Sequence, residues 1–372
     1  MSDDVQDPVS DRVATEPPWS VDPTRWGRRL LGAPVRRGTA LLVVVVVVRS
    51  GIGVYDLTMV EITQRFPMPH PSYKGVSVIG PALASWLGVD ANSTWVLLHA
   101  PIVVAVLSLC VVLVGRGAPD RRTAITVRAV VLASGLPVVL LGRIGHYDVW
   151  FALGSVLVVL APTLPAAFVG GAVLGATNIS QAGVALVACA LCAGATGARF
   201  GVRLATAAVG ALAARALVGV WYRSNGVEVD SRVAHLTGQL TRSMEGFARS
   251  APLAVWSWFG AAWVVVIALV LMPRSATHRA AVGVGLIGLP ALASVTTLDG
   301  TRVFVMVSLP ALLVLLARVS TDGVATPEHA TIERATWTAV GVMLVTPGLM
   351  TWVDGEILSP WGSLLGHLTR VL

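Results

Sequence analysis

Charged side chains are scarce in this sequence, and lysine is almost absent. Charged residues make up 13% of the 372 positions against 55% hydrophobic residues, and Lys74 is the only lysine. The mean hydropathy is +0.76. A soluble protein does not carry this much apolar surface with so little charge, so the composition excludes a soluble globular protein. The net charge of +7 comes almost wholly from arginine, which is common at membrane edges and gives no indication of nucleic-acid binding.

Cysteines are few, and several catalytic motifs are missing. Cys110, Cys189 and Cys192 all lie in apolar runs. The spacing from Cys189 to Cys192 is that of CxxC, but the intervening Ala and Leu and the lack of a nearby histidine favour a helix contact over a metal or redox site. The sequence has no GxxxxGK[ST], HExxH or GxSxG motif. These absences argue against cytosolic ATP-driven chemistry, so energy would come from a preactivated substrate or an ion gradient.

Long apolar runs are what the sequence does have. Several approach the roughly 20 residues that a helix needs to cross a bilayer. They predict an all-α, polytopic transmembrane helical bundle of about eleven spans. The predicted spans lie near 39–57, 94–114, 123–142, 149–162, 164–178, 180–197, 203–222, 252–272, 280–298, 302–318 and 336–353. Several are shorter than a full crossing, so tilted or incomplete helices are expected around 148–180.

Arginines set the expected orientation. Four short connections carry most of them: Arg28, Arg29, Arg36 and Arg37, then Arg116, Arg121 and Arg122, then Arg199 and Arg203, then Arg274 and Arg279. The positive-inside rule makes this face cytoplasmic. The amino terminus is then inside and the carboxyl terminus outside.

This orientation divides the chain into three parts. We expect a disordered cytoplasmic tail over 1–38, a transmembrane domain over 39–353, and an outer amphipathic tail over 354–372. Two outer loops, 51–93 and 223–251, are long enough to hold interfacial helices. Apolar residues at helical spacing indicate one such helix around Val76 to Leu87 and another within 230–249.

The first outer loop carries two carboxylates directly after the first span. Asp56 and Glu61 lie at the expected outer bilayer edge. A carboxylate there can act as a general base toward a sugar hydroxyl, or can bind a divalent ion beside a diphosphate. The alternative is a solvated acidic loop in which Glu61 pairs with Arg65.

Two tight outer turns hold further charges. The turn Gly142–Asp148 contains Arg143, His146 and Asp148, and the second, Leu298–Arg302, contains Asp299 and Arg302. Arginine and histidine at this depth suit a headgroup phosphate. The alternatives are an Arg143–Asp148 pair at the interface, and an Asp299 that pairs locally with Arg302 and caps the following helix.

Arg215 lies inside a predicted span, about two turns from its outer end. A buried arginine needs a partner or an aqueous cavity, so it could reach a phosphate from below or extend outward to the interface. Arg49 presents the same choice in the first span, and we expect it to extend outward.

This layout resembles the GT-C class of membrane glycosyltransferases, which use polyprenyl-phosphate-linked sugars. The shared features are an inside amino terminus, about eleven spans, and a long first outer loop with acids just after the first span. The resemblance implies that Asp56 is the base and Glu61 a second base or an ion ligand, with Mg or Mn as the ion. It implies that Arg302, Arg143 or Arg215 holds the lipid phosphate.

The expected function is therefore transfer of a sugar from a polyprenyl-phosphate donor to a cell-envelope glycan or lipid acceptor, at the outer face of a bacterial inner membrane. No metal ligand set and no nucleic-acid partner is predicted. A transporter or flippase of a lipid-linked or small polar substrate could use the same charges, but it would need a polar path to the other side. A polysaccharide polymerase and a structural membrane subunit are further alternatives.

Overall fold

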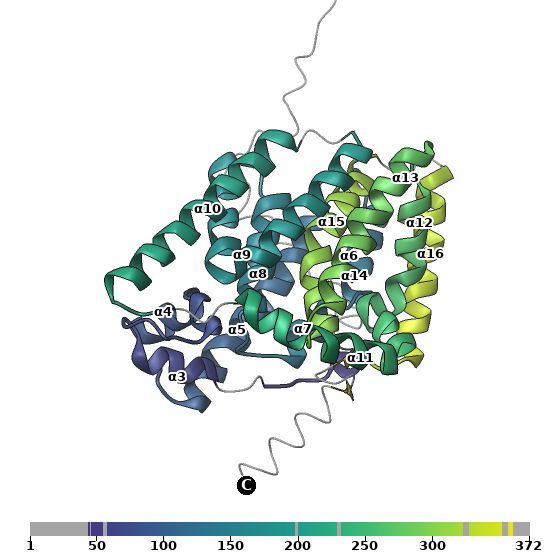
Figure 1. The fold of residues 1–372 in the computed structure, drawn as a ribbon. Helices are drawn as coiled ribbons and strands as arrows, with labels where there is room; N and C mark the ends of the chain where they lie inside the picture. Colours follow the sequence, from purple (N-terminus) through teal and green to yellow (C-terminus); the bar gives the residue numbers. More distant parts are fainter. Residues whose placement is uncertain are drawn as a thin grey trace, which may run out of the picture. The chain divides into compact units, whose positions relative to one another are not determined.

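The computed structural model describes residues 44, 46–54, 58–197, 200–228, 232–322, 327–351 and 356–359. The tail 1–38 and residues 360–372 of the predicted outer tail lie outside these residues, as does Asp56. Within them the chain is almost entirely helical (Figure 1). The strands are one short antiparallel pair, β1 (Met350–Thr351) and β2 (Ile357–Leu358).

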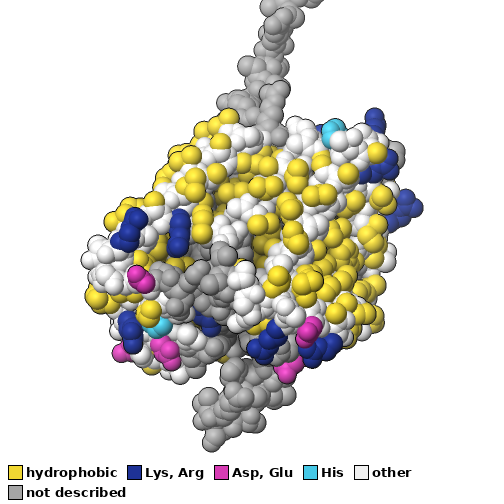
Figure 2. Space-filling model, viewed as in Figure 1, with side chains coloured by type: hydrophobic (Ala, Val, Ile, Leu, Met, Phe, Trp, Pro, Cys, Tyr) yellow, Lys and Arg dark blue, Asp and Glu magenta, His cyan; other side chains and the backbone are white. Residues whose placement is uncertain are grey.

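Six helical segments of the described residues are long and apolar enough to cross a membrane, which identifies a multi-pass integral membrane protein. They include α5 (Asn92–Val114), α9 (Leu164–Ala195), α10 (Gly201–Ser224) and α15 (Gly300–Asp322). The other two are composite: α11 (Arg232–Phe259), η2 (Gly260–Ala262) and α12 (Trp263–Leu271) form one, and α13 (Ala276–Gly283), η3 (Val284–Gly288) and α14 (Leu289–Val295) form the other. Hydrophobic side chains cover much of the face shown in Figure 2, and charged ones gather along its lower margin and at its upper right.

A seventh span is formed if a bent pair of helices is counted as one crossing. α6 (Arg121–Ala133) and α7 (Leu136–Gly142) meet at 51°. At the bend the Ser134 hydroxyl donates to the Val131 carbonyl and accepts from the Leu136 N–H, so the freed backbone groups keep partners. The structure thus has six or seven candidate spans where the sequence predicts about eleven, and that higher count and the sides of the termini remain predictions.

α9 explains part of the difference. The sequence predicts two spans there, and the structure has one helix broken at Asn178, where φ is −163° and ψ is 91°. The Asn178 side-chain oxygen accepts from the Gln181 N–H and so caps the second half of the helix. The freed carbonyls of Ala176 and Thr177 accept from the Val78 N–H and the Ser77 hydroxyl. The break is therefore satisfied from outside the helix.

α15 is the central helix of the bundle. It packs against α9, α14, α8 (Asp148–Leu160), α11, α6 and α7, and its side chains are buried on all sides from Val303 to Leu316. A helix that is apolar around its whole circumference belongs in such a core. α9 and α10 make the closest helix contact, where a side chain at Gly171 or Gly175 would overlap the backbone of Ala207 or Ala211.

The two ends of the bundle differ. At one end, α16 (Pro327–Val345) is tied to α6 by an ion pair between Arg122 and Glu333. At the other, lower in Figure 1, α7 ends, α8 and α15 begin, and the short elements α3 (Thr58–Arg65), η1 (Tyr73–Val76) and α4 (Ile79–Trp86) lie beside the lower part of α5. Helices are present where the sequence predicts them around 76–87 and within 230–249, as α4 and the first part of α11, and their place at the membrane interface stays a prediction.

Candidate functional site

The turn from α7 to α8 is shaped by a glycine and an indole. Gly145 has φ +91°, a conformation that favours glycine, and a side chain there would overlap the Trp95 ring. The Trp95 indole N–H donates to the Gly145 carbonyl at 3.3 Å. This close packing fixes the backbone on which Arg143, His146 and Asp148 are mounted.

The segment before Asp56 runs beside the same turn. The Gly53 N–H donates to the Leu141 carbonyl at 2.9 Å, and the Ile144 N–H donates to the Gly53 carbonyl at 3.0 Å. Val54 and Ile144 form a parallel bridge. The described segment ends at Val54, two residues before Asp56, so the predicted base follows a strand-like segment anchored on the charged turn.

Five charged or titratable side chains from the two outer turns touch one another, and we call them the ion network. Both terminal nitrogens of Arg143 face the Asp299 carboxylate, at 3.3 and 3.5 Å. Arg302 bridges two carboxylates, with 3.1 Å from Nη2 to Asp299 Oδ2 and 3.1 Å from Nη1 to Asp148 Oδ1. His146 Nδ1 lies 2.8 Å from Asp148 Oδ2.

The ion network is buried and balanced in charge. Arg143, His146, Asp148 and Arg302 are buried, and Asp299 is the most accessible member, with 21% of its side chain exposed. Burial lowers the pKa of His146 to about 4, helped by the charges of Arg302 and Arg143 and opposed by Asp148. Burial disfavours ionised Asp299, but Arg143 and Arg302 outweigh it and hold the pKa of this carboxyl below its usual value. Two arginines thus offset two carboxylates around a neutral histidine.

The structure brings together five of the eight predicted site residues. Arg143 binds Asp299 and Asp148 binds Arg302 in place of an Arg143–Asp148 pair, whereas the local Asp299–Arg302 pair is confirmed. Glu61 is exposed on α3, and Arg215 is half-buried on α10; neither is bonded to the ion network. Asp56 lies outside the described residues, so its contacts stay a prediction.

Sequence reasoning missed the polar groups that support the ion network. Tyr147 accepts a hydrogen bond from Arg302 at 3.0 Å, and the Arg302 guanidinium lies 5.3 Å from the centre of its ring. Thr301, next to Arg302, is bonded to Ser257 of α11 at 2.5 Å and to Thr351 of β1 at 2.8 Å. Tyr147 and Thr301 directly precede two of the predicted site residues, Asp148 and Arg302, in the sequence. This position was the signal that could have identified them.

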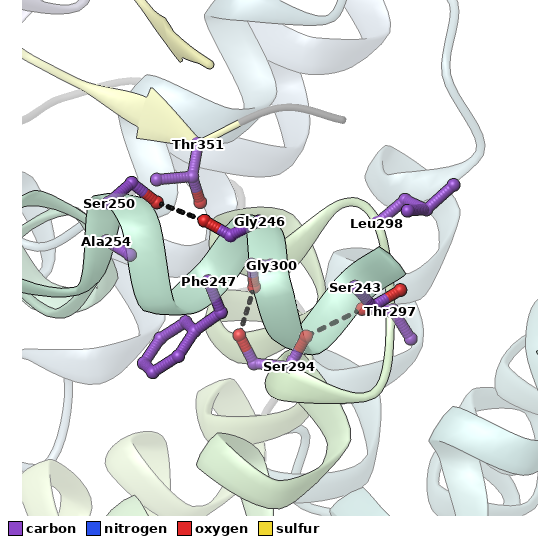
Figure 3. A pocket seen from close by; sticks show the side chains of 10 residues that line it. All are labelled: Ser243, Gly246, Phe247, Ser250, Ala254, Ser294, Thr297, Leu298, Gly300 and Thr351. Atoms are coloured by element: carbon purple, nitrogen blue, oxygen red, sulfur yellow. Dashed lines mark hydrogen bonds between the residues drawn. The ribbon is translucent and has the colours of Figure 1, made fainter. Parts of the chain in front are cut away.

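A small polar cavity lies beside the ion network (Figure 3). Its walls are α11, the 294–300 turn and Thr351, and its hydroxyl groups include those of Ser243, Ser250 and Thr297. The Ser243 hydroxyl is buried and has no hydrogen-bond partner in the part of the chain that the structure describes. The centre of a water-sized sphere can move in about 20 Å³ of this cavity, which is room for about one water and not for a sugar.

The described residues contain no group of three or more His, Cys, Asp or Glu side chains arranged to hold a metal ion. A site for Mg or Mn built around Asp56 would involve residues beyond those described, so it stays a prediction. No protein-family model, curated protein or solved structure matches this chain.

Proposed function

We propose that this protein is a membrane glycosyltransferase that transfers a sugar from a polyprenyl-phosphate donor to a cell-envelope glycan or lipid acceptor. The observation that carries the proposal is the confinement of buried charge to one end of a central helix. Arg302 joins the ion network in the first turn of α15, and from Val303 to Leu316 that helix is buried and apolar apart from Ser308. Buried charge at only one end of this helix suits an enzyme that acts at one face better than a carrier, which needs a polar path across the membrane.

In this proposal Asp56 is the general base. It removes a proton from an acceptor hydroxyl while that oxygen attacks the anomeric carbon. The new carbon–oxygen bond forms as the bond from the anomeric carbon to the phosphate oxygen breaks, so the polyprenyl phosphate leaves with the electron pair and the anomeric configuration inverts.

The ion network then acts as a positioning element. Arg143 and Arg302 are held by carboxylates, and the turn that carries Arg143 pairs with residues 53 and 54, just before Asp56. Fixed charges and a fixed turn would hold the catalytic loop in one geometry, which is how preorganisation lowers a barrier.

The test is sugar transfer by the purified protein in proteoliposomes. Labelled undecaprenyl-phosphate hexoses and pentoses serve as donors, and cell-envelope membranes serve as acceptors. We expect transfer by the wild type and none by Asp56→Asn. Asp90→Asn is the matched control, because Asp90 is an exposed carboxylate in the same outer loop, and it should keep full activity. Equal activity of Asp56→Asn and Asp90→Asn would remove Asp56 as the base.

A second candidate, a flippase of a lipid-linked substrate, is favoured by the break in α9. Broken helices with polar side chains line substrate sites in many transporters. At this break the Asn178 amide nitrogen and the Gln181 amide oxygen are buried without partners among the described residues. Translocation of fluorescent undecaprenyl-phosphate sugars across the same proteoliposomes, without acceptor, would favour this candidate over the enzyme.

A further inference from the structure

A second feature at the network end of the bundle is an apolar cleft that contains one arginine. It has a volume of about 380 Å³, within the range of small-molecule sites. Its walls are the segment that includes Val44, Val48 and Arg49, and residues 343–347 at the end of α16. Apart from Arg49 and Thr346 the lining side chains are aliphatic, methionine or proline.

Exposed aliphatic side chains border the cleft. Val44, Val48, Leu344 and Val345 are exposed aliphatic side chains, with Val345 81% exposed. An exposed aliphatic surface of this kind on a multi-pass membrane protein suits contact with hydrocarbon chains rather than water. An occupant of this cleft would therefore enter from the bilayer and carry an apolar chain.

Arg49 makes the cleft unusual. The residue is 8% exposed, and its Nε donates to the Thr346 carbonyl at 3.2 Å. No ion pair includes it among the residues that the structure describes, and no acceptor is bonded to its two terminal nitrogens. A buried cation is costly unless an anion pairs with it. Arg143 and Arg302 differ in this respect, because each already holds a carboxylate.

The backbone around Arg49 is built to leave room for its guanidinium. Gly260 has φ +55°, and a side chain at this glycine would overlap Arg49 Nη2. The Gly348 N–H donates to the Arg49 carbonyl at 3.1 Å, which ties the residue to the chain after α16. The arginine is thus fixed at the cleft by contacts from two other segments.

We propose that this cleft binds the lipid donor, with the phosphate on Arg49 and the polyprenyl chain along the aliphatic walls. The inference rests on the proposed function and names Arg49, rather than Arg143, Arg215 or Arg302, as the phosphate-holding residue. A sugar-phosphate-polyprenol is a phosphodiester with a single negative charge, which one guanidinium neutralises. Residues 50–54 lead directly from Arg49 to the turn of the ion network and toward Asp56, so the phosphate and the predicted base lie on one continuous segment.

Binding can be measured apart from catalysis by titrating the detergent-purified full chain with undecaprenyl phosphate. We expect binding by the wild type and by Asp56→Asn, and binding weaker by about tenfold or more in Arg49→Gln, as expected for loss of a charge-assisted hydrogen bond. Arg65→Gln is the matched control, because Arg65 is an exposed arginine on α3, and it should bind like the wild type. Unchanged binding in Arg49→Gln would overturn the proposal.

Two further arms identify the ligand chemistry. Neutral undecaprenol and dioleoylphosphatidylglycerol are added as competitors, and neither should displace undecaprenyl phosphate at equal concentration. Displacement by undecaprenol would overturn the phosphate contact, and displacement by the phospholipid would make the cleft a general lipid site.

A variant that leaves Arg49 unchanged tests the cleft separately from any folding defect in Arg49→Gln. Val345→Trp adds bulk at a mostly exposed position of the cleft and leaves Arg49 in place, so it should fold and lose binding. Normal binding in this variant would overturn the cleft as the site. Binding that persists in a protein with no transferase activity would instead count against the enzyme and leave the lipid site standing.

Discussion

The guanidinium of Arg143 is paired with both carboxylate oxygens of Asp299, a residue 156 positions later in the chain. This contact joins the turn before α8 to the turn before α15, and Arg302 extends it to Asp148. The bundle therefore closes one of its ends with buried charges rather than with apolar packing.

Removing one carboxylate from the ion network should destabilise the protein strongly. Asp299→Asn leaves Arg143 and Arg302 without their shared partner, and breaking a buried pair in this way costs about 3–5 kcal/mol. Thermal unfolding in detergent measures the effect. Glu245→Gln is the control, because Glu245 and Arg249 are exposed and their nitrogen–oxygen distance is 3.8 Å; such surface pairs contribute about 0–1 kcal/mol. Equal melting temperatures for the two variants would contradict a stabilising role for the ion network.

Stability should fall as the pH drops from 6.5 toward 4. The pKa of His146 is lowered to about 4 in the folded chain, so the unfolded chain binds a proton at higher pH than the folded chain does. This proton binding stabilises the unfolded chain over the interval. Asp299 acts at lower pH: its lowered pKa stabilises the fold above the ordinary carboxyl pKa, and this contribution is lost as the pH falls further. Melting temperatures between pH 8 and 4 measure the slope, which His146→Asn should flatten between 6.5 and 4. An unchanged slope in that variant would place the titrating group elsewhere.

Substitution by alanine should destabilise the protein at one glycine of α9 and not at another. A methyl group at Gly175 would overlap the Ala211 backbone, whereas Gly183 has open space around it. Gly175→Ala should force α9 and α10 apart at a cost of about 1–3 kcal/mol. Gly183→Ala should be neutral or stabilise the helix by up to about 1 kcal/mol. Thermal unfolding of the two variants in parallel provides the comparison, and destabilisation by Gly183→Ala alone would contradict the packing.

Cysteine labelling tests the expected orientation. Asp90 lies at the end of the bundle that holds the ion network, and His278 lies in the first turn of α13; both are exposed. The three natural cysteines are buried. A membrane-impermeant maleimide applied to intact cells should label Asp90→Cys and leave His278→Cys unlabelled until the membrane is opened. The reverse pattern would invert the topology and move the ion network to the cytoplasmic face.

The sequence was a good guide where a signal is local. Apolar length predicted α5, α10 and α15 to within a few residues, and the two charged turns lie together at one end of the bundle, as the sequence predicts. Helical spacing of apolar residues also indicated α4 and the first part of α11.

Partner choice could not be predicted in the same way. Arg143 and Asp148 are five residues apart, and only the packing of α15 against α7 and α8 gives each a partner from another turn. The break at Asn178 depends on Ser77 and Val78, which lie about 100 residues earlier, so nothing in the local pattern distinguishes one bent helix from two spans. Arg49 was expected to extend toward the interface, and it is buried instead because Thr346 and Gly260 make a place for it.

The break in α9 has a mechanical consequence. Because Ser77 and Val78 satisfy two carbonyls of that helix, the surface element α4 cannot lift away without leaving both carbonyls bare in apolar surroundings, at about 1–3 kcal/mol each. The hydrogen bonds from residues 77–78 therefore hold the start of α4 against the break in α9. Any ligand large enough to displace α4 would have to supply two hydrogen-bond donors in its place, or else would bend α9 further as it entered.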